Sequence, residues 1–195
     1  MNDQLRTRIV EALTSAGQYD LAAQLREPDR ILFDNEWLQI RETPDRYVYC
    51  HDAKGGGHGV AVLAYRAVDG EIQVVGRYER CPCHHDGFAL TSLTGMMDSS
   101  LEDAVATAVR ELKEEAGIDA TTDEMESLGT VRPSKHDDAV LHLFCVDVGD
   151  REIGEAVGDG TAGEVGAYCR WVSFKDAIWS KSASLVTMVA RLAER

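Results

Sequence analysis

The chain has 195 residues, 44% of them hydrophobic and 28% charged, which excludes a disordered tail or a fibrous repeat. A net charge of −14 argues against nonspecific binding to nucleic acid or an anionic membrane, because both need a basic patch. No apolar run approaches the roughly 20 residues that span a bilayer, and the amphipathic N-terminus lacks an apolar signal core, so we expect a cytoplasmic protein. The cysteines number five, an odd count, and we expect free thiols.

The N-terminal part is predicted to form helices and then strands. Apolar residues at helical spacing predict two short amphipathic helices over residues 3–26, separated by the breaker SAGQYD. The alternating stretch ILFDNEWLQIRETPDRYVYCHD, residues 31–52, predicts a hairpin of strands. We therefore expect an N-terminal helical extension over residues 1–28 and a single domain over residues 29–195.

The glycine cluster AKGGGHG, residues 53–59, is predicted to be a connecting loop. It lacks the Gly-Lys-Ser/Thr ending of a phosphate-binding P-loop, and it precedes a strand where a P-loop precedes a helix. After it, VAVLAYRAVDGEIQVVGRYER predicts two strands joined at Asp69 and Gly70, because Asp-Gly is a strong hairpin turn.

The C-terminal part alternates strands, a loop and helix. AVLHLFCVDV and YCRWVSF are typical of strands, and an acidic, glycine-rich loop over residues 149–166 lies between them. The closing segment, residues 175–195, predicts a helix with a break near Ser180. Strand hairpins interrupted by one long helix and closed by another indicate an α/β or α+β fold.

A long helix is predicted to end at Gly117, which can take the left-handed C-terminal turn. Two capping-box patterns mark its start, Ser99 with Glu102 and Ser100 with Asp103. The apolar residues of the helix form a stripe that leaves three glutamates grouped at spacings of three and four. These glutamates are Glu111, Glu114 and Glu115.

Like charges at these spacings repel by a few tenths of a kcal/mol per pair, so helix propensity does not account for the glutamates. A hard divalent cation such as Mg²⁺ accounts for them, because it prefers carboxylate and phosphate oxygens. The alternative is a solvated acidic face in an acidic protein.

The order of these residues favours the cation. RELKEEAGI, residues 110–118, preceded by Glu102, resembles the Nudix box, whose pattern is Gly, five residues, Glu, seven residues, Arg-Glu-aliphatic-x-Glu-Glu-x-Gly-aliphatic. The resemblance implies the Nudix fold, a mixed β-sheet sandwiched between helices.

The resemblance also implies roles for the box residues. Arg110 would hold Glu111, while Glu111, Glu114 and Glu115 bind Mg²⁺ or Mn²⁺. The metal would activate a water that attacks phosphorus once a glutamate has taken its proton. Besides a box glutamate, Glu155 and Glu164 on the acidic loop are the candidates for this base.

The upstream end of the box departs from the family pattern. The family glycine is expected at position 96, where this chain has Met96, with Gly95 one place earlier. Either Met96 replaces the glycine, or the loop between Gly95 and Leu101 carries one additional residue that bulges outward. We favour the bulge, which makes Gly95 the residue whose backbone carbonyl contributes a metal ligand.

Sequence segments outside the box, which are less specific than the box itself, resemble the ADP-ribose and nucleotide-sugar pyrophosphatase branch of the family. They include HGVAVLAY, VVGRYER and PSKHDDAVLHLF, although TSLTG replaces the usual Glu-Leu-Pro-Ala-Gly ahead of the box. The branch implies a small nucleoside diphosphate derivative as substrate, and a homodimer. We predict substrate contacts from Arg77, Arg80 and Asp137.

Two other functional readings of the sequence remain open. The altered loop ahead of the box is compatible with a catalytically weak, ligand-binding or regulatory Nudix domain. CPCHH, residues 81–85, offers soft ligands for a structural zinc ion, although Cys-x-Cys differs from the usual Cys-x2-Cys spacing. A loop near the substrate cleft is the other interpretation of CPCHH.

Overall fold

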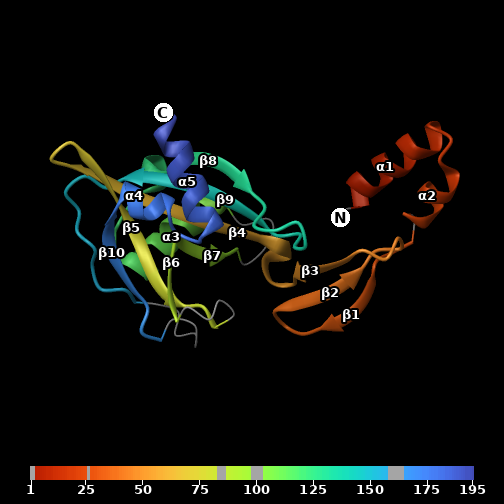
Figure 1. The fold of residues 1–195 in the computed structure, drawn as a ribbon, viewed down its shortest axis with the longest axis horizontal. Helices are drawn as coiled ribbons and strands as arrows, with labels where there is room; N and C mark the ends of the chain where they lie inside the picture. The colour runs from red at the N-terminus through yellow and green to blue at the C-terminus, as the bar shows by residue number, and fades with distance from the viewer. Residues whose placement is uncertain (1–2, 26, 83–86, 98–102, 158–164) are drawn as a thin grey trace.

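A computed structural model describes residues 3–25, 27–82, 87–97, 103–157 and 165–195. Its main body is a seven-stranded mixed β-sheet with helices on both faces (Figure 1). Two N-terminal helices and a separate three-stranded sheet extend to one side of this body. The predicted architecture, a mixed sheet between helices with an N-terminal helical extension, is therefore confirmed.

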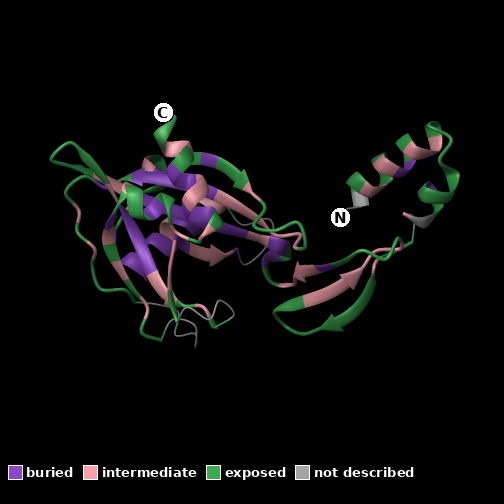
Figure 2. Cartoon of the chain, in the orientation of Figure 1, coloured by how far each residue is buried: buried purple, intermediate pink, exposed green. Residues whose placement is uncertain are grey.

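The N-terminal region contains the two short helices that the sequence predicts, followed by three strands where a hairpin was expected. The elements are α1 (Asp3–Ser15), α2 (Tyr19–Gln24), β1 (Arg30–Asp34), β2 (Leu38–Glu42) and β3 (Val48–Asp52). All pairings in this small sheet are antiparallel. Much of this sheet is exposed (Figure 2). Phe33 of β1 and Trp37, which lies between β1 and β2, are 51% and 52% exposed. The proposed boundary between residues 28 and 29 stays a prediction.

The large sheet has the strand order β10-β5-β4-β9-β8, and β6 and β7 pair with β5 and β4. The elements are η1 (Lys54–Gly57), β4 (His58–Val68), β5 (Glu71–Arg80), β6 (Phe88–Thr91), β7 (Leu93–Met96), β8 (Glu126–Val131), β9 (Val140–Asp147) and β10 (Tyr168–Ser173). Asp69 and Gly70 have φ values of 53° and 82°, as a two-residue hairpin turn requires, so the predicted β4–β5 hairpin is confirmed. β4 pairs with β9 in parallel.

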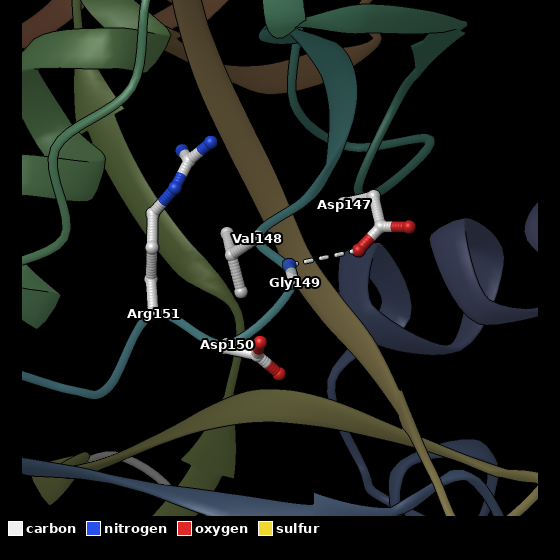
Figure 3. A pocket seen from close by; sticks show the side chains of 5 residues that line it. All are labelled: Asp147, Val148, Gly149, Asp150 and Arg151. Atoms are coloured by element: carbon white, nitrogen blue, oxygen red, sulfur yellow. Dashed lines mark hydrogen bonds between the residues drawn. The ribbon is translucent and has the colours of Figure 1, made fainter.

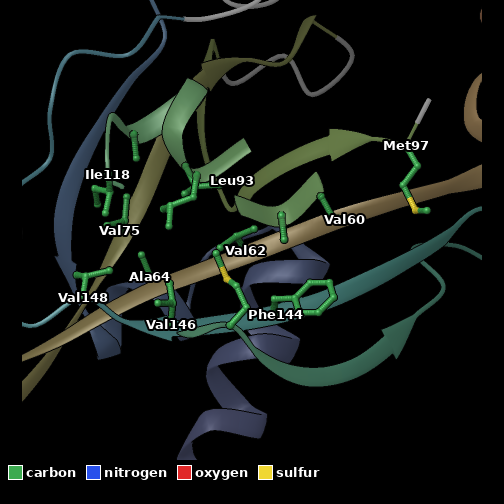
Figure 4. Close-up of a cluster of buried hydrophobic side chains, with 14 residues drawn as sticks. Val60, Val62, Ala64, Val75, Leu93, Met97, Ile118, Phe144, Val146 and Val148 are labelled. Atoms are coloured by element: carbon green, nitrogen blue, oxygen red, sulfur yellow. The ribbon is translucent and has the colours of Figure 1, made fainter. Parts of the chain in front are cut away.

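The strand β4 is buried on both faces because helices cover the sheet on both sides. Its residues Val60, Val62 and Ala64 pack with α3 (Ala104–Ala116) in the cluster drawn in Figure 4. The alternate residues Ala61 and Leu63 pack against the other helical layer. That layer consists of α4 (Phe174–Ile178) and α5 (Ala183–Ala193), and a short turn, η3 (Thr122–Glu124), follows α3. The break between α4 and α5 confirms the interruption predicted near Ser180.

The predicted start of the carboxylate helix is wrong, whereas its end is confirmed. The helix begins at Ala104, and its N-cap is Asp103, whose side chain accepts the N–H of Val105 at 3.1 Å. A short carboxylate adjacent to the first turn can satisfy an unpaired N–H there, which makes Asp103 a suitable cap. At the other end, Gly117 takes the left-handed conformation with φ of 63°. The residues 98–102, which include the expected caps Ser99 and Ser100, lie outside the described ranges.

Within the described ranges, no helix is long and apolar enough to cross a membrane. The described cysteines Cys50, Cys81, Cys145 and Cys169 are free thiols, as expected.

Candidate active site

The three glutamates of α3 lie on one side of the helix but differ in exposure. Glu111 and Glu115 are buried, with 8% and 7% of their surface exposed, because they face the sheet beside the apolar stripe. The side chain of Glu114 is 34% exposed. One helix therefore presents two carboxylates to the interior and one to the surface.

Gly95 faces the first of these carboxylates. It lies in β7 opposite Val60 of β4, on the face of the sheet that α3 covers. A Cβ added to Gly95 would lie 2.5 Å from Cγ of Glu111 and closer still to its carboxylate. Glycine is thus the residue that leaves room for Glu111 here. Met96, the alternative position for the family glycine, pairs with Gly59.

Arg110 forms ion pairs with two of the three glutamates, Glu111 and Glu114. Its Nη1 lies 2.9 Å from Oε1 of Glu111 and 2.9 Å from Oε2 of Glu114. The ion pair expected between Arg110 and Glu111 is therefore present, and the same guanidinium also reaches Glu114. With one cation between two anions, the repulsion expected at this spacing is reduced.

Glu115 is held from the sheet. Arg77 of β5 forms a close ion pair with its Oε1, and the backbone N–H of Thr94 donates to its Oε2 at 2.9 Å. Burial raises the pKa of Glu115 to about 8, against the opposing effect of Arg77, and the nearby Glu111 adds to the rise. In the absence of a cation, Glu115 therefore keeps a proton to a higher pH than an ordinary glutamate.

The acidic loop reaches the C-terminal end of α3. Gly154 donates its N–H to the carbonyl of Ala116 at 2.9 Å, and Val157 donates to the carbonyl of Glu114 at 3.0 Å. A Cβ on Gly117 would lie 2.6 Å from the carbonyl carbon of Gly154, so a glycine allows the close approach of the loop. This docking brings Glu155, an exposed residue, to the end of the carboxylate helix. The other base candidate, Glu164, lies outside the described residues, as does Glu102.

A cleft of about 580 Å³ lies beside η1, between β3 and the segment before β9. Its lining includes Tyr47, His58, Arg132, Lys135 and Asp137. Stacking of the Tyr47 ring on His136, with centroids 5.5 Å apart, puts an aromatic pair at the rim. The cleft therefore combines aromatic surface, cations and a carboxylate.

The cleft is linked to the carboxylate helix through β4 and β7. His58, the first residue of β4, accepts the N–H of Met97 at its carbonyl oxygen, 3.1 Å away, just after β7 ends. Gly55 of η1 also lies directly against the backbone of Met97. The strand β4, which begins at the cleft with His58, therefore pairs with β7, the strand that contains Gly95.

The predicted substrate residues occupy three different environments. Asp137 is half-buried in the cleft, where its carboxylate accepts the N–H of Ala139 at 2.7 Å. Arg80 is exposed at the end of β5. Arg77, by contrast, is 4% exposed and pairs with carboxylates. The substrate contacts predicted for these residues stay predictions.

A second hollow follows β9 at residues 147–151 (Figure 3). Its lining supplies the carboxylates of Asp147 and Asp150, and the Asp147 carboxylate accepts the N–H of Gly149 at 2.9 Å. The guanidinium of Arg151 is engaged with Glu124 and with the carbonyl of Asp119. This hollow is therefore more acidic than the cleft beside η1, whose lining includes Arg132 and Lys135.

Sequence reasoning missed the link between Arg77 and Glu115. A signal was available, because residues two apart on a strand share a face. Arg77 follows the core residue Val75 at this spacing and precedes Glu79, so both charged residues of β5 face α3. A charged pair in register with a core valine indicates a buried ionic contact.

The family model of the NUDIX domain matches residues 57–192. The chain therefore belongs to the Nudix hydrolase family, as the box residues led us to expect. No curated protein matches the chain in sequence.

Solved structures with the same fold share little sequence with the chain. A structure of an ADP compounds hydrolase is 15% identical, with a TM-score of 0.58, covering 86% of this chain and 90% of the other. The NUDIX domain of Shewanella oneidensis NrtR complexed with ADP ribose is 14% identical, with a TM-score of 0.55 and coverage of 71% and 86%. A C. elegans Ap4A hydrolase binary complex is 19% identical, with a TM-score of 0.50 and coverage of 70% and 95%. At these identities the likeness establishes the fold alone.

Proposed function

We propose that the chain is a Mg²⁺- or Mn²⁺-dependent pyrophosphohydrolase. Its substrate is a nucleoside diphosphate linked to another group, and ADP-ribose or a nucleotide sugar is the favoured class. The observation that carries the proposal is the group of three glutamates on α3, held by Arg110 and Arg77 and faced by Gly95.

The donor set fits a hard divalent cation. Glu111, Glu114 and Glu115 offer carboxylate oxygens from one helix, and Gly95 leaves space beside Glu111. Within the described ranges, no three carboxylate, histidine or cysteine side chains form a ready-made metal cage. Because arginines hold the glutamates in this arrangement, we expect at least one carboxylate, Glu114 being the most exposed, to turn away from its arginine when a cation binds.

The residues of the chain then divide the work. Glu111, Glu114 and Glu115 would hold the cation, with the Gly95 carbonyl as a further ligand. Such a cation supplies charge neutralisation at the diphosphate and lowers the pKa of the attacking water. A glutamate accepts the proton of that water while the water oxygen bonds to phosphorus and the bridging P–O bond breaks. The products are two phosphate monoesters when the substrate is ADP-ribose or a nucleotide sugar.

The base is a box glutamate, Glu155 or Glu164. The docking of the acidic loop on α3 supports Glu155, because it holds the backbone on both sides of this residue against the helix end. Comparing the pH profiles of Glu155→Gln and Glu164→Gln with that of the parent chain tests both loop candidates. The base is the residue whose loss lowers kcat and removes the acidic limb of the profile.

The cleft beside η1 supports a nucleotide as the bound group. Tyr47 and His136 offer a stacking surface for a base, and Arg132 and Lys135 offer positive charge in a chain of net charge −14. The Asp137 carboxylate is suited to accept hydrogen bonds that the hydroxyls of a ribose or sugar donate. The NUDIX domain of Shewanella oneidensis NrtR, which has the same fold, binds ADP ribose in its solved complex, and this supports the proposed substrate class.

A second candidate is a ligand-binding Nudix domain with weak or no hydrolysis. The ion pairs of Arg110 with Glu111 and Glu114 favour it, because a cation must compete with the guanidinium for these two carboxylates. A chain of this kind would bind nucleotide in the cleft without turning it over.

We also propose a homodimer in the cytoplasm. Exposed apolar side chains on the small sheet and its β1–β2 connection, among them Ile31, Phe33 and Trp37, are of the kind that an interface covers. Light scattering of the parent chain and of Phe33→Asp tests this proposal, because an interface at this sheet predicts a monomeric variant.

A substrate panel tests the proposed reaction. Purified protein with Mg²⁺ or Mn²⁺ is offered ADP-ribose, UDP- and GDP-sugars, dinucleoside polyphosphates, NADH and oxidised nucleoside triphosphates, and products are separated by chromatography. Metal-dependent release of a nucleoside monophosphate from ADP-ribose or a sugar nucleotide is the expected result. Tight nucleotide binding with no turnover of any panel member would instead favour the ligand-binding domain.

A further inference from the structure

Arg77 is an arginine inside the body of the protein. It lies in β5 between β6 and β10, and its side chain faces α3 from the sheet. With only 4% of its surface exposed, it has lost most of its contact with water. A buried guanidinium is tolerated when carboxylates and hydrogen bonds compensate its charge.

The compensation comes from two carboxylates on different elements. Arg77 contacts Oε1 of Glu115 on α3, and its Nε lies 3.1 Å from Oε2 of Glu79 on its own strand. Glu79 is fixed in turn by the hydroxyl of Thr91, which donates to its other oxygen at 3.1 Å. A chain of polar contacts therefore runs from β6 through β5 to the carboxylate helix.

Both oxygens of Glu115 have a donor in this arrangement. Arg77 contacts one, and the backbone N–H of Thr94 donates to the other at 2.9 Å. Glu111 and Glu114 have a different partner, Arg110, whose side chain is 39% exposed. Glu115 is thus held by groups of the sheet, whereas Glu111 and Glu114 share the partly exposed guanidinium of Arg110.

We propose that Arg77 is a positioning residue, which orients the Glu115 carboxylate for the divalent cation and is itself oriented by Glu79. This inference rests on the proposed function, because it takes Glu115 as a metal ligand. Groups that orient a ligand carboxylate from behind reduce the freedom that cation binding would otherwise remove, and their loss typically weakens metal affinity about 10- to 100-fold. The role differs from the phosphate contact predicted for Arg77, since it requires no contact with substrate.

The test measures Mn²⁺ affinity and turnover separately. Mn²⁺ binding to the substrate-free protein is followed by electron paramagnetic resonance of the free ion, and KM and kcat are measured at saturating metal. Arg77→Met is expected to weaken Mn²⁺ binding about 10- to 100-fold, with little change in KM. Arg77→Lys, which keeps the charge but has one nitrogen in place of a fork, is expected to restore part of the affinity.

Two further variants separate positioning from general stability. Glu79→Gln leaves Arg77 and Glu115 in place, and it is expected to weaken Mn²⁺ binding less than Arg77→Met does. Arg66→Met is the matched control, because Arg66 is also an arginine of the large sheet, paired with Glu152 at 2.8 Å and stacked on Trp171. Its loss is expected to lower the melting temperature without changing Mn²⁺ affinity.

Two results would overturn the inference. They are an Arg77→Met protein with the Mn²⁺ affinity of the parent, whether or not its KM is raised, and an equal loss of affinity in Arg66→Met. If Arg77→Met does not fold, the inference is overturned when both Glu79→Gln and Arg77→Lys bind Mn²⁺ with the affinity of the parent. A parent chain that binds Mn²⁺ but hydrolyses no panel substrate contradicts the proposed function alone, because the affinity comparison still decides the role of Arg77.

Discussion

The substitution Gly95→Ala is expected to damage the active site more than the fold. The new Cβ would lie 2.5 Å from Cγ of Glu111, and ordinary van der Waals contact begins at about 3.4 Å, so Glu111 must retreat by about 1 Å at Cγ and further at its carboxylate. The atoms that it meets belong to the outer part of a flexible side chain, which can move without shifting the backbone. A displacement of about 1 Å in a catalytic group costs roughly 100-fold in rate, or about 2.7 kcal/mol of transition-state stabilisation.

The assay compares kcat and Mg²⁺ affinity of Gly95→Ala with those of the parent and of Gly76→Ala. Gly76 is a matched control, because it lies in the same sheet, and its added Cβ would meet Leu90 at 2.5 Å and no carboxylate. Both variants are expected to lose about 1–3 kcal/mol of unfolding free energy by overpacking, but only Gly95→Ala should lose metal-dependent activity. A Gly95→Ala enzyme with the metal affinity and kcat of the parent would refute the assignment of Gly95 as the glycine of the metal site.

Three further predictions concern α3. Glu114→Gln or Glu115→Gln should lower kcat by at least about 100-fold with the fold intact, and a kcat within about threefold of the parent at saturating metal would contradict the metal site. Because burial raises the pKa of Glu115 to about 8, a proton competes with the cation below that pH. Mg²⁺ affinity measured by calorimetry should therefore rise about tenfold from about pH 7 to about pH 9, and a rise that persists in Glu115→Gln would assign it to another group. Gly117→Ala should lower the free energy of unfolding in urea by about 2 kcal/mol or more, because it strains a left-handed residue and crowds Gly154, and an unchanged transition midpoint would show that the loop yields.

Local patterns account for the parts of the fold that the sequence predicts well. The turn at Asp69 and Gly70 and the helix end at Gly117 depend on positive φ values, which few residues adopt. The strands β6 and β7 were missed because each has four residues, and the single residue Ser92 between them is too short a break to form a recognisable turn motif. The start of α3 was misplaced because Ser99, Ser100 and Asp103 are all good caps, and composition does not rank them.

The candidate site also has a part that the sequence predicts and a part that it does not. The three glutamates follow from their spacing on one helix, which is a local property. The partners of Glu115 are not local, because Arg77 and Thr94 come from strands that lie before α3 in the chain and reach it only through the sheet. Predicting that contact needs the strand order and the face of each residue, and neither is fixed by a motif.

The parallel pairing of β4 with β9 has a consequence for synthesis of the chain. His58 lies opposite Val140, so one edge of the central strand waits about 80 residues for its neighbour. At translation rates of about 5–20 residues per second, that edge stays open for roughly 4–16 s. During this interval Val60, Val62 and Leu63, which are completely buried in the finished fold, lie beside unpaired backbone groups that can capture another nascent strand. Yield from a recombinant host should therefore depend on growth temperature and chaperone supply more than the stability of the finished protein would suggest.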